Sequence, residues 1–217
     1  FPIKGVIWYQ GEANVGRSEQ YGDLFPALIT DWRRQWRSDF PFYFVQLANF
    51  MESKKIQPDS EWAALREAQT KALKLDQVGM AVTIDIGLAD DIHPKNKQEV
   101  GRRLALVALA GSYGKNVSSS APVFQNYIIK GNKMELDFGQ KQDGFQIKGT
   151  TLKGFTIAGP DRVFYPAEAM VQNGKIILSS TEVPAPLAAR YGWADNPDCN
   201  LYGENGLPVA PFRTDCW

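Results

Sequence analysis

His93 is the only histidine in the 217-residue chain, and its neighbours are acidic. It lies in the segment Asp90-Asp91-Ile92-His93-Pro94, between an apolar run and a segment of helical period. An imidazole can take a proton from a nucleophile, and a nearby carboxylate can fix its tautomer and stabilise the imidazolium. The sequence therefore indicates a general base, the alternative being a surface histidine at the entrance of a helix. A single His without further His or Cys nearby makes a poor zinc site, so no metal is expected.

A second polar cluster follows the first apolar run of the chain. Residues 5–10 are predicted to form a buried strand, and Gln10, Glu12 and Asn14 stand at and just beyond its carboxyl end. Gln10 or Asn14 could donate a hydrogen bond to an oxyanion, and Glu12 could orient a base. The alternative is a polar turn with Gly11 at a tight corner.

A nucleophile is harder to find in this sequence. No serine stands in a Gly-x-Ser-x-Gly pattern, and Ser112 falls at the end of a predicted helix rather than on a strand-to-helix elbow. No phosphate loop or dinucleotide fingerprint occurs, so no cofactor is expected. The chain offers a base and hydrogen-bond donors without a persuasive nucleophile.

The elements that must position these residues alternate in the first half of the chain between short apolar runs and segments of helical period. Such alternation is typical of an α/β fold with a parallel sheet flanked by helices. Ligands of such sheets bind at the carboxyl ends of the strands, so we expect His93 and Gln10 to converge on one pocket. Pro26 is expected to mark a kink or an irregular turn, and Ser60 to cap a helix. The predicted strands are residues 5–10, 42–48 and 79–86, and the predicted helices are residues 18–37, 61–75 and 96–113.

The second half changes character after a serine-rich joint at residues 115–121. Short runs rich in Val, Ile, Phe and Tyr are separated by Gly and Asn turns, which predicts antiparallel strands without parallel pairing or a long helix. From residue 183 onward, Pro, Gly, Asn and aromatic residues predict an ordered coil. The predicted strands are residues 123–130, 133–138, 154–159, 167–171 and 175–179.

The charge balance narrows the class of partner. Twenty-four Lys and Arg balance 24 Asp and Glu, so no net field would attract nucleic acid or an anionic membrane. No window approaches the roughly 18 apolar residues that would span a bilayer. A neutral or small polar substrate fits this composition.

Several motifs carry a family resemblance. They are residues 5–14 (GVIWYQGEAN), residues 91–104 (DIHPKNKQEVGRRL), and the shorter blocks 200–202, 206–208 and 211–214. Together they resemble the carboxyl-terminal portion of a sialate O-acetylesterase, a family of SGNH (GDSL-like) hydrolases. The resemblance spans nearly the whole chain.

The resemblance implies roles for the candidate site residues. His93 matches the family's catalytic histidine, which activates a serine, and Gln10 and Asn14 fall in the block that helps to form the oxyanion hole. Three carboxylates could be the acid of the triad, ranked Asp91 first, Glu12 second and Asp90 third.

The resemblance also implies what the chain does not contain. The family's serine lies in a Gly-Gln-Ser-Asn-like block upstream of the matching region, so we expect a piece of a longer polypeptide whose partner is the missing amino-terminal segment. The expected activity is a serine esterase that deacetylates sialic acids through an acetyl-enzyme, inactive as this piece alone. The alternatives are an acetyl xylan esterase of related fold and a non-catalytic carbohydrate-binding fragment.

The same resemblance gives expectations for the second half. Residues 1–120 would be the carboxyl-terminal part of the hydrolase domain, and residues 121–217 a β-rich accessory region with an aromatic tail. Tyr191, Trp193 and Tyr202 could stack on a sugar or could simply bury the tail. An exported location, periplasmic, extracellular or lysosomal, would suit a disulfide between Cys199 and Cys216.

Overall fold

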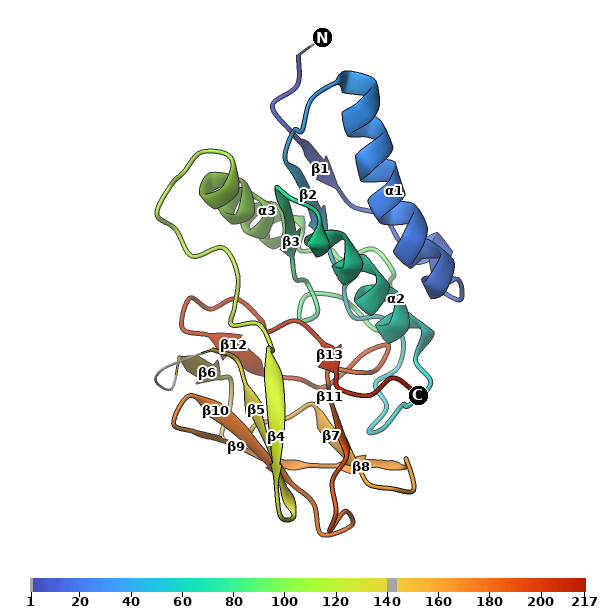
Figure 1. Ribbon diagram of the computed structural model, residues 1–217, viewed down its shortest axis with the longest axis vertical. Helices are drawn as coiled ribbons and strands as arrows, with labels where there is room; N and C mark the ends of the chain where they lie inside the picture. Colours follow the sequence, from blue (N-terminus) through green and yellow to red (C-terminus); the bar gives the residue numbers. More distant parts are fainter. Residues whose placement is uncertain (1, 140–143) are drawn as a thin grey trace. The chain divides into compact units, whose positions relative to one another are not determined.

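The computed structural model describes residues 2–139 and 144–217, which form two compact units (Figure 1). The first unit comprises Phe1–Met51 and Glu61–Ser120, and the second comprises Glu52–Ser60 and Ala121–Trp217. The nine residues of Glu52–Ser60 therefore leave the first unit and pack as part of the second.

The first unit contains the predicted parallel sheet. Its strands are β1 (Val6–Trp8), β2 (Phe42–Val45) and β3 (Val78–Ala81), in the order β1-β2-β3. Both pairings are parallel, with Val6 opposite Phe42 and Phe42 opposite Val78. The carboxyl ends of the three strands therefore lie at one edge of the sheet.

Helices cover both faces of this sheet, as the side chains of β2 demonstrate. Phe42 and Phe44 belong to an apolar cluster with residues of α1 (Ser18–Trp36) and α2 (Glu61–Thr70). The intervening Tyr43 points the other way, and its hydroxyl hydrogen-bonds Ser112 Oγ, 2.8 Å away, at the end of α3 (Lys97–Gly111). Because successive side chains of a strand alternate between faces, α1 and α2 cover one face and α3 the other (Figure 1). The predicted α/β fold is confirmed.

Two local predictions for this unit were wrong. The sequence predicted a buried first strand, but β1 is at the edge of the described sheet and Ile7 is 69% exposed. Only the face carrying Val6 and Trp8 packs on the core. The irregular turn allowed for at Pro26 is absent, because α1 is helical throughout and buried neighbours such as Phe25 hold this stretch against the sheet.

The helix starts agree well with the sequence. The helix α2 begins at Glu61, directly after Ser60, and a 3-10 turn, Lys71–Lys74, completes the predicted 61–75 segment. The α3 helix begins at Lys97, with the side chain of Asn96 accepting a hydrogen bond from Glu99 N at 3.1 Å. This cap fixes where the loop from β3 ends.

The second unit is antiparallel in every pairing between its described strands, as predicted. Its sheets have the orders β4-β5-β10-β9, β13-β11-β7-β8 and β12-β6. No helix occurs in the described part of residues 121–217. The strands are β4 (Asn126–Lys130), β5 (Lys133–Asp137), β6 (Phe145–Ile147), β7 (Phe155–Ala158), β8 (Phe164–Pro166), β9 (Glu168–Gln172), β10 (Lys175–Ser179), β11 (Ala188–Tyr191), β12 (Leu201–Gly203) and β13 (Phe212–Arg213).

The carboxyl-terminal tail departs from the predicted coil. It contributes β11, β12 and β13, and β11 lies between β7 and β13. Its residues Ala188–Tyr191 are all buried, so strand pairing satisfies backbone groups that a buried coil would leave without partners. Cys199 and Cys216 are not joined by a disulfide, so the bridge allowed for by the sequence is not formed.

Candidate functional site

His93 lies in the loop between β3 and α3, with Asp91 beside it. Its side chain is 84% exposed, and Nδ1 is 3.5 Å from Asp91 Oδ1. The same carboxylate oxygen accepts a hydrogen bond from His93 N at 2.9 Å. This hydrogen bond, with smaller electrostatic contributions from Lys95 and His93, lowers the pKa of Asp91. Asp91 is therefore an anion held next to the imidazole.

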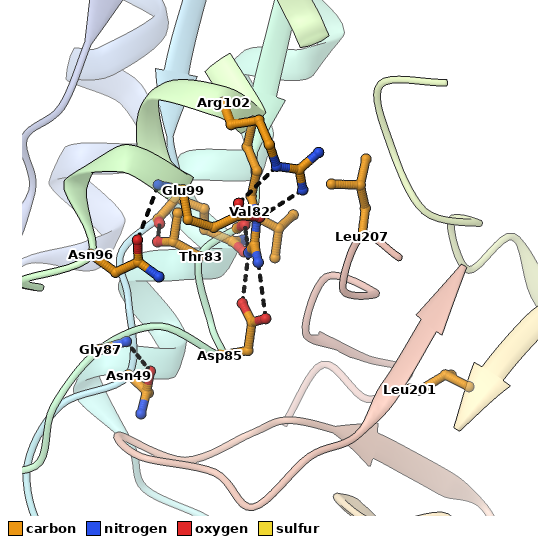
Figure 2. A network of polar contacts seen from close by, with 12 residues as sticks. Asn49, Val82, Thr83, Asp85, Gly87, Asn96, Glu99, Arg102, Leu201 and Leu207 are labelled. Atoms are coloured by element: carbon orange, nitrogen blue, oxygen red, sulfur yellow. Dashed lines mark hydrogen bonds and ion pairs between the residues drawn. The ribbon is translucent and has the colours of Figure 1, made fainter. Parts of the chain in front are cut away.

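The His93 loop is fastened to the segment that leaves β2. Gly87 N donates to Asn49 Oδ1 at 2.7 Å (Figure 2). Phe50 forms a parallel bridge with Leu88. A Cβ atom on Gly87 would lie 1.9 Å from the backbone oxygen of Asn49, so only glycine permits this approach. Further along the loop, Ile92 packs against the apolar core.

A buried arginine ties the start of the loop to α3. Arg103, on α3, forms two hydrogen bonds with the carboxylate of Asp85, at 2.6 and 2.9 Å, and a third with Val82 O at 2.7 Å. Its Nε also donates to Glu99 Oε1 at 2.8 Å. Figure 2 shows this network, in which Asp85 and Glu99 approach one guanidinium group. The bidentate pair ties the start of the loop to the helix that follows it.

Glu99 gives this network a pH dependence. Hydrogen bonds from Arg102 and then Arg103 lower the pKa of Glu99 from 4.5 to about 2, against the opposing effect of burial. Because the pKa is lower in the folded state, the stabilisation is complete above pH 4.5 and disappears as the pH falls towards 2.

We therefore expect the difference in the free energy of unfolding between the wild type and Glu99→Gln to shrink as the pH falls from 4.5 to 2. Urea denaturation across this range measures it. Glu168→Gln, at an exposed position on β9, is the matched control and should leave the wild-type pH profile unchanged. A difference for Glu99→Gln that does not vary with pH would contradict the assignment.

The second polar cluster is held together by its own hydrogen bonds. Gln10 Nε2 donates to Asn14 Oδ1 at 2.7 Å, and Gln10 Oε1 accepts from the hydroxyl of Tyr21 at 3.2 Å. Gln10 O accepts from Gln69 Nε2 at 3.2 Å. Asn14 Oδ1 accepts the hydrogen bond from Gln10, so the amide N–H groups of Asn14 and the second N–H of Gln10 remain available as donors. This arrangement fits the predicted oxyanion donors.

The turn between Gln10 and Asn14 needs glycine at position 11. Gly11 has a φ of 156°, and a Cβ atom there would lie 3.2 Å from Gln69 Nε2 and 3.3 Å from Leu47. The turn continues into a short 3-10 helix, Glu12–Asn14. Burial and then the negative charge of Glu12 raise the pKa of Tyr9 to about 12, so the Glu12 carboxylate lies within electrostatic reach of Tyr9.

Buried polar residues on α2 support this edge of the sheet, and the sequence analysis missed them. Arg66 is fully buried and donates to Leu47 O and Ala48 O, both at 2.9 Å. Gln69 Oε1 accepts from Leu47 N at 2.9 Å. Arg66 and Gln69 follow Trp62 at spacings of four and seven, which is the spacing of one helix face. This spacing is the signal by which the sequence could have placed Arg66 and Gln69 on the buried face of the helix.

The structure brings the candidate residues into two groups. Among the residues described, Gln10, Glu12 and Asn14 form no hydrogen bond or ion pair with Asp90, Asp91 or His93. Residues next to each group, Tyr9 and Ile92, both pack against one apolar cluster. The convergence of His93 and Gln10 on one pocket stays a prediction.

Of the three acid candidates, only Asp91 contacts the imidazole in the described structure. Asp90 is exposed and Glu12 is half-buried. Across residues 2–139 and 144–217, no three His, Cys, Asp or Glu side chains gather closely enough to hold a metal ion. None of the described helices is both long and apolar enough to cross a membrane.

Comparison with known proteins identifies similar sequences and folds. A family model described as carbohydrate esterase, sialic acid-specific acetylesterase, matches residues 2–110. Sialate O-acetylesterases from Pongo abelii and Homo sapiens are 32% and 31% identical to the chain over 240 aligned residues and 97% of its length. The chain spans only 45% of the length of either relative.

A solved structure resembles the whole chain. The crystal structure of a novel carbohydrate acetylesterase from Xanthomonas citri aligns with a TM-score of 0.93 and 46% sequence identity. The alignment covers 100% of this chain and 51% of the other.

Proposed function

Because the chain belongs to the carbohydrate esterase family of sialic acid-specific acetylesterases, we propose that the complete protein hydrolyses O-acetyl esters of sialic acids. The observation that carries the proposal is the Asp91–His93 pair, which lies inside the family-matched residues 2–110. A serine from a segment outside these 217 residues supplies the nucleophile. That segment is the partner on which activity depends.

In the proposed mechanism, His93 acts as base and then as acid. Its Nε2 takes the proton of the serine hydroxyl while the serine oxygen attacks the acetyl carbon, and the carbonyl becomes an oxyanion. Asp91, 3.5 Å from Nδ1, stabilises the imidazolium that forms. The N–H groups of Asn14 and Gln10 donate to the oxyanion. The sugar hydroxyl leaves with the proton from His93, and the serine keeps the acetyl group.

The second half of the cycle repeats these roles with water. His93 takes a proton from water as the oxygen attacks the acetyl-enzyme, and a second oxyanion forms at the same donors. When it collapses, the serine leaves with the proton from His93, and acetate is released. The cycle consumes one water and needs no metal or cofactor.

An edge strand of the described sheet supports the proposal of a missing segment. No strand of the described chain pairs with the outer edge of β1, and Ile7 on this strand is 69% exposed. A strand from the missing segment that pairs here would cover Ile7 and satisfy the free backbone groups. We propose this strand pairing. We also propose that the complete protein is exported.

Substrate comparison tests the proposed function. The complete protein should hydrolyse a 9-O-acetylated sialic acid with a kcat/KM at least roughly tenfold above that for an acetylated xylo-oligosaccharide, a difference of about 1.4 kcal/mol in the barrier. The 217-residue chain alone should turn over neither substrate. The reverse preference would make the protein an acetyl xylan esterase. No hydrolysis of either ester by the complete protein would leave the carbohydrate-binding alternative.

A further inference from the structure

A hollow of about 470 Å³ lies in the second unit, and every residue that lines it belongs to that unit. Its floor is formed by the buried side chains of Leu152, Phe155 and Phe164. Its volume falls within the range of small-molecule sites, which combine an apolar lining with a few fixed polar groups.

One wall of the hollow is the segment Glu52–Ser60, which has no helix or strand but is firmly anchored. Asp195 accepts a hydrogen bond from Ser60 Oγ at 2.6 Å and another from Gln57 Nε2. Asp195 N donates back to Gln57 Oε1 at 3.2 Å. Ile56 packs against the apolar cluster that includes Phe164. The wall is therefore built into the unit.

Buried Arg190 strengthens the same wall. It donates to Pro58 O at 2.8 Å and forms two hydrogen bonds with Asp215, at 2.9 and 2.7 Å. Its guanidinium also lies over the ring of Phe164, 3.9 Å from the centroid. Asp215, which also lies 3.6 Å from Arg213 Nη1, pairs with this arginine and holds it in the wall.

The exposed lining residues of the hollow carry an excess of positive charge. Lys153 and Asp198 form an ion pair of 2.9 Å and neutralise each other. Lys54 and Lys55 also line the hollow, are exposed, and form no ion pair within the described parts of the chain. Two exposed lysines and several buried apolar side chains thus line one hollow, which suits a ligand with one anionic group and one apolar group.

Of the three tail aromatics considered from the sequence as a sugar-stacking surface, two are inaccessible. Tyr191 and Tyr202 are buried. The indole N–H of Trp193 donates to Pro58 O at 3.1 Å, and the guanidinium groups of Arg190 and Arg213 lie 5.0 and 4.8 Å from its ring centroid. Tyr191 and Tyr202 therefore offer no stacking surface, whereas the half-buried Trp193 belongs to the lining of the hollow.

We propose that this hollow is a binding site for a carboxylate-bearing, N-acetylated sugar. The carboxylate meets Lys54 and Lys55, and the acetamido methyl group packs against the Phe155 and Phe164 floor. An inorganic anion would leave the floor unused, and a neutral sugar would leave the two ammonium groups unused. The site lies in the second unit, so it goes beyond the esterase chemistry proposed for the first.

Calorimetric titration of the complete protein with N-acetylneuraminic acid tests the site by the number of sugars bound. Ala167 lines the hollow, and Ala167→Trp would fill it, so this variant should bind one sugar molecule fewer than the wild type. Met170→Trp, at an exposed position on β9 outside the lining, is the control and should bind the wild-type number. An unchanged number for a folded Ala167→Trp would overturn the proposal.

A second variant tests the charge without altering the fold. Lys54→Met with Lys55→Met should weaken binding at this site at least tenfold, whereas the exposed Lys133→Met on β5 should not. N-acetylglucosamine and inorganic phosphate are the comparison ligands. Equal binding of the neutral sugar, or phosphate binding that depends on both lysines, would overturn the assignment to an acidic sugar. Ester hydrolysis is not the readout, so failure here is distinct from failure of the proposed esterase.

Discussion

Replacing His93 with alanine in the complete protein is expected to lower kcat by roughly four orders of magnitude or more, because loss of the base removes both proton transfers of the proposed cycle. Stability should change by about 0.5 kcal/mol or less, because the side chain is 84% exposed and packs on nothing in the core. Steady-state hydrolysis of an acetylated sialic acid, with thermal unfolding of the same preparation, measures both effects.

Gln98→Ala is the matched control for this experiment. Gln98 is exposed in the first turn of α3, five residues from His93, and has no role in proton transfer. Its replacement should leave kcat within a few-fold of the wild type. If His93→Ala kept more than about a tenth of wild-type turnover, a change worth only about 1.4 kcal/mol, then His93 would not be the base and the mechanism would fail.

The positions of the candidate groups could be predicted because their signals are local. Apolar runs separated by helical segments predicted the parallel sheet. The polar residues that follow these runs predicted the side chains at the carboxyl edge of the sheet. The sequence predicted the start of α3 as well, since Asn96 accepts from Glu99 N as an N-cap residue does. These features depend on residues close together in the chain.

The parts that escaped prediction depend on distant contacts. Ile7 reads as a core residue, yet β1 has no described neighbour on its outer side. Arg66 reads as a surface residue of α2, but backbone oxygens at Leu47 and Ala48 accept its hydrogen bonds in the interior. The tail strand Ala188–Tyr191 is held by pairing with β7 and β13. In each case a partner far along the chain overrides the local preference.

Three carboxylates are candidates for the acid of the proposed triad, and the geometry favours Asp91. Asp91→Asn is expected to lower kcat by roughly 10⁴-fold, whereas Glu12→Gln and Asp90→Asn should each cost less than about tenfold. Asp91 Oδ1 is 3.5 Å from Nδ1 of His93. A hydrogen bond from His93 N lowers the pKa of Asp91, which keeps it ionised as the imidazolium forms. Glu12 instead acts electrostatically on Tyr9.

Asparagine is the informative replacement because it separates the charge of Asp91 from its structural role. Its amide oxygen can still accept the hydrogen bond from His93 N, now 2.9 Å, so the loop should keep its shape while the negative charge is lost. A large fall in kcat with unchanged KM and unchanged thermal stability would assign the loss to the missing charge. A larger fall in kcat for Glu12→Gln than for Asp91→Asn would transfer the acid to the Gln10–Asn14 turn. The Asp91–His93 contact would then serve only to shape the loop.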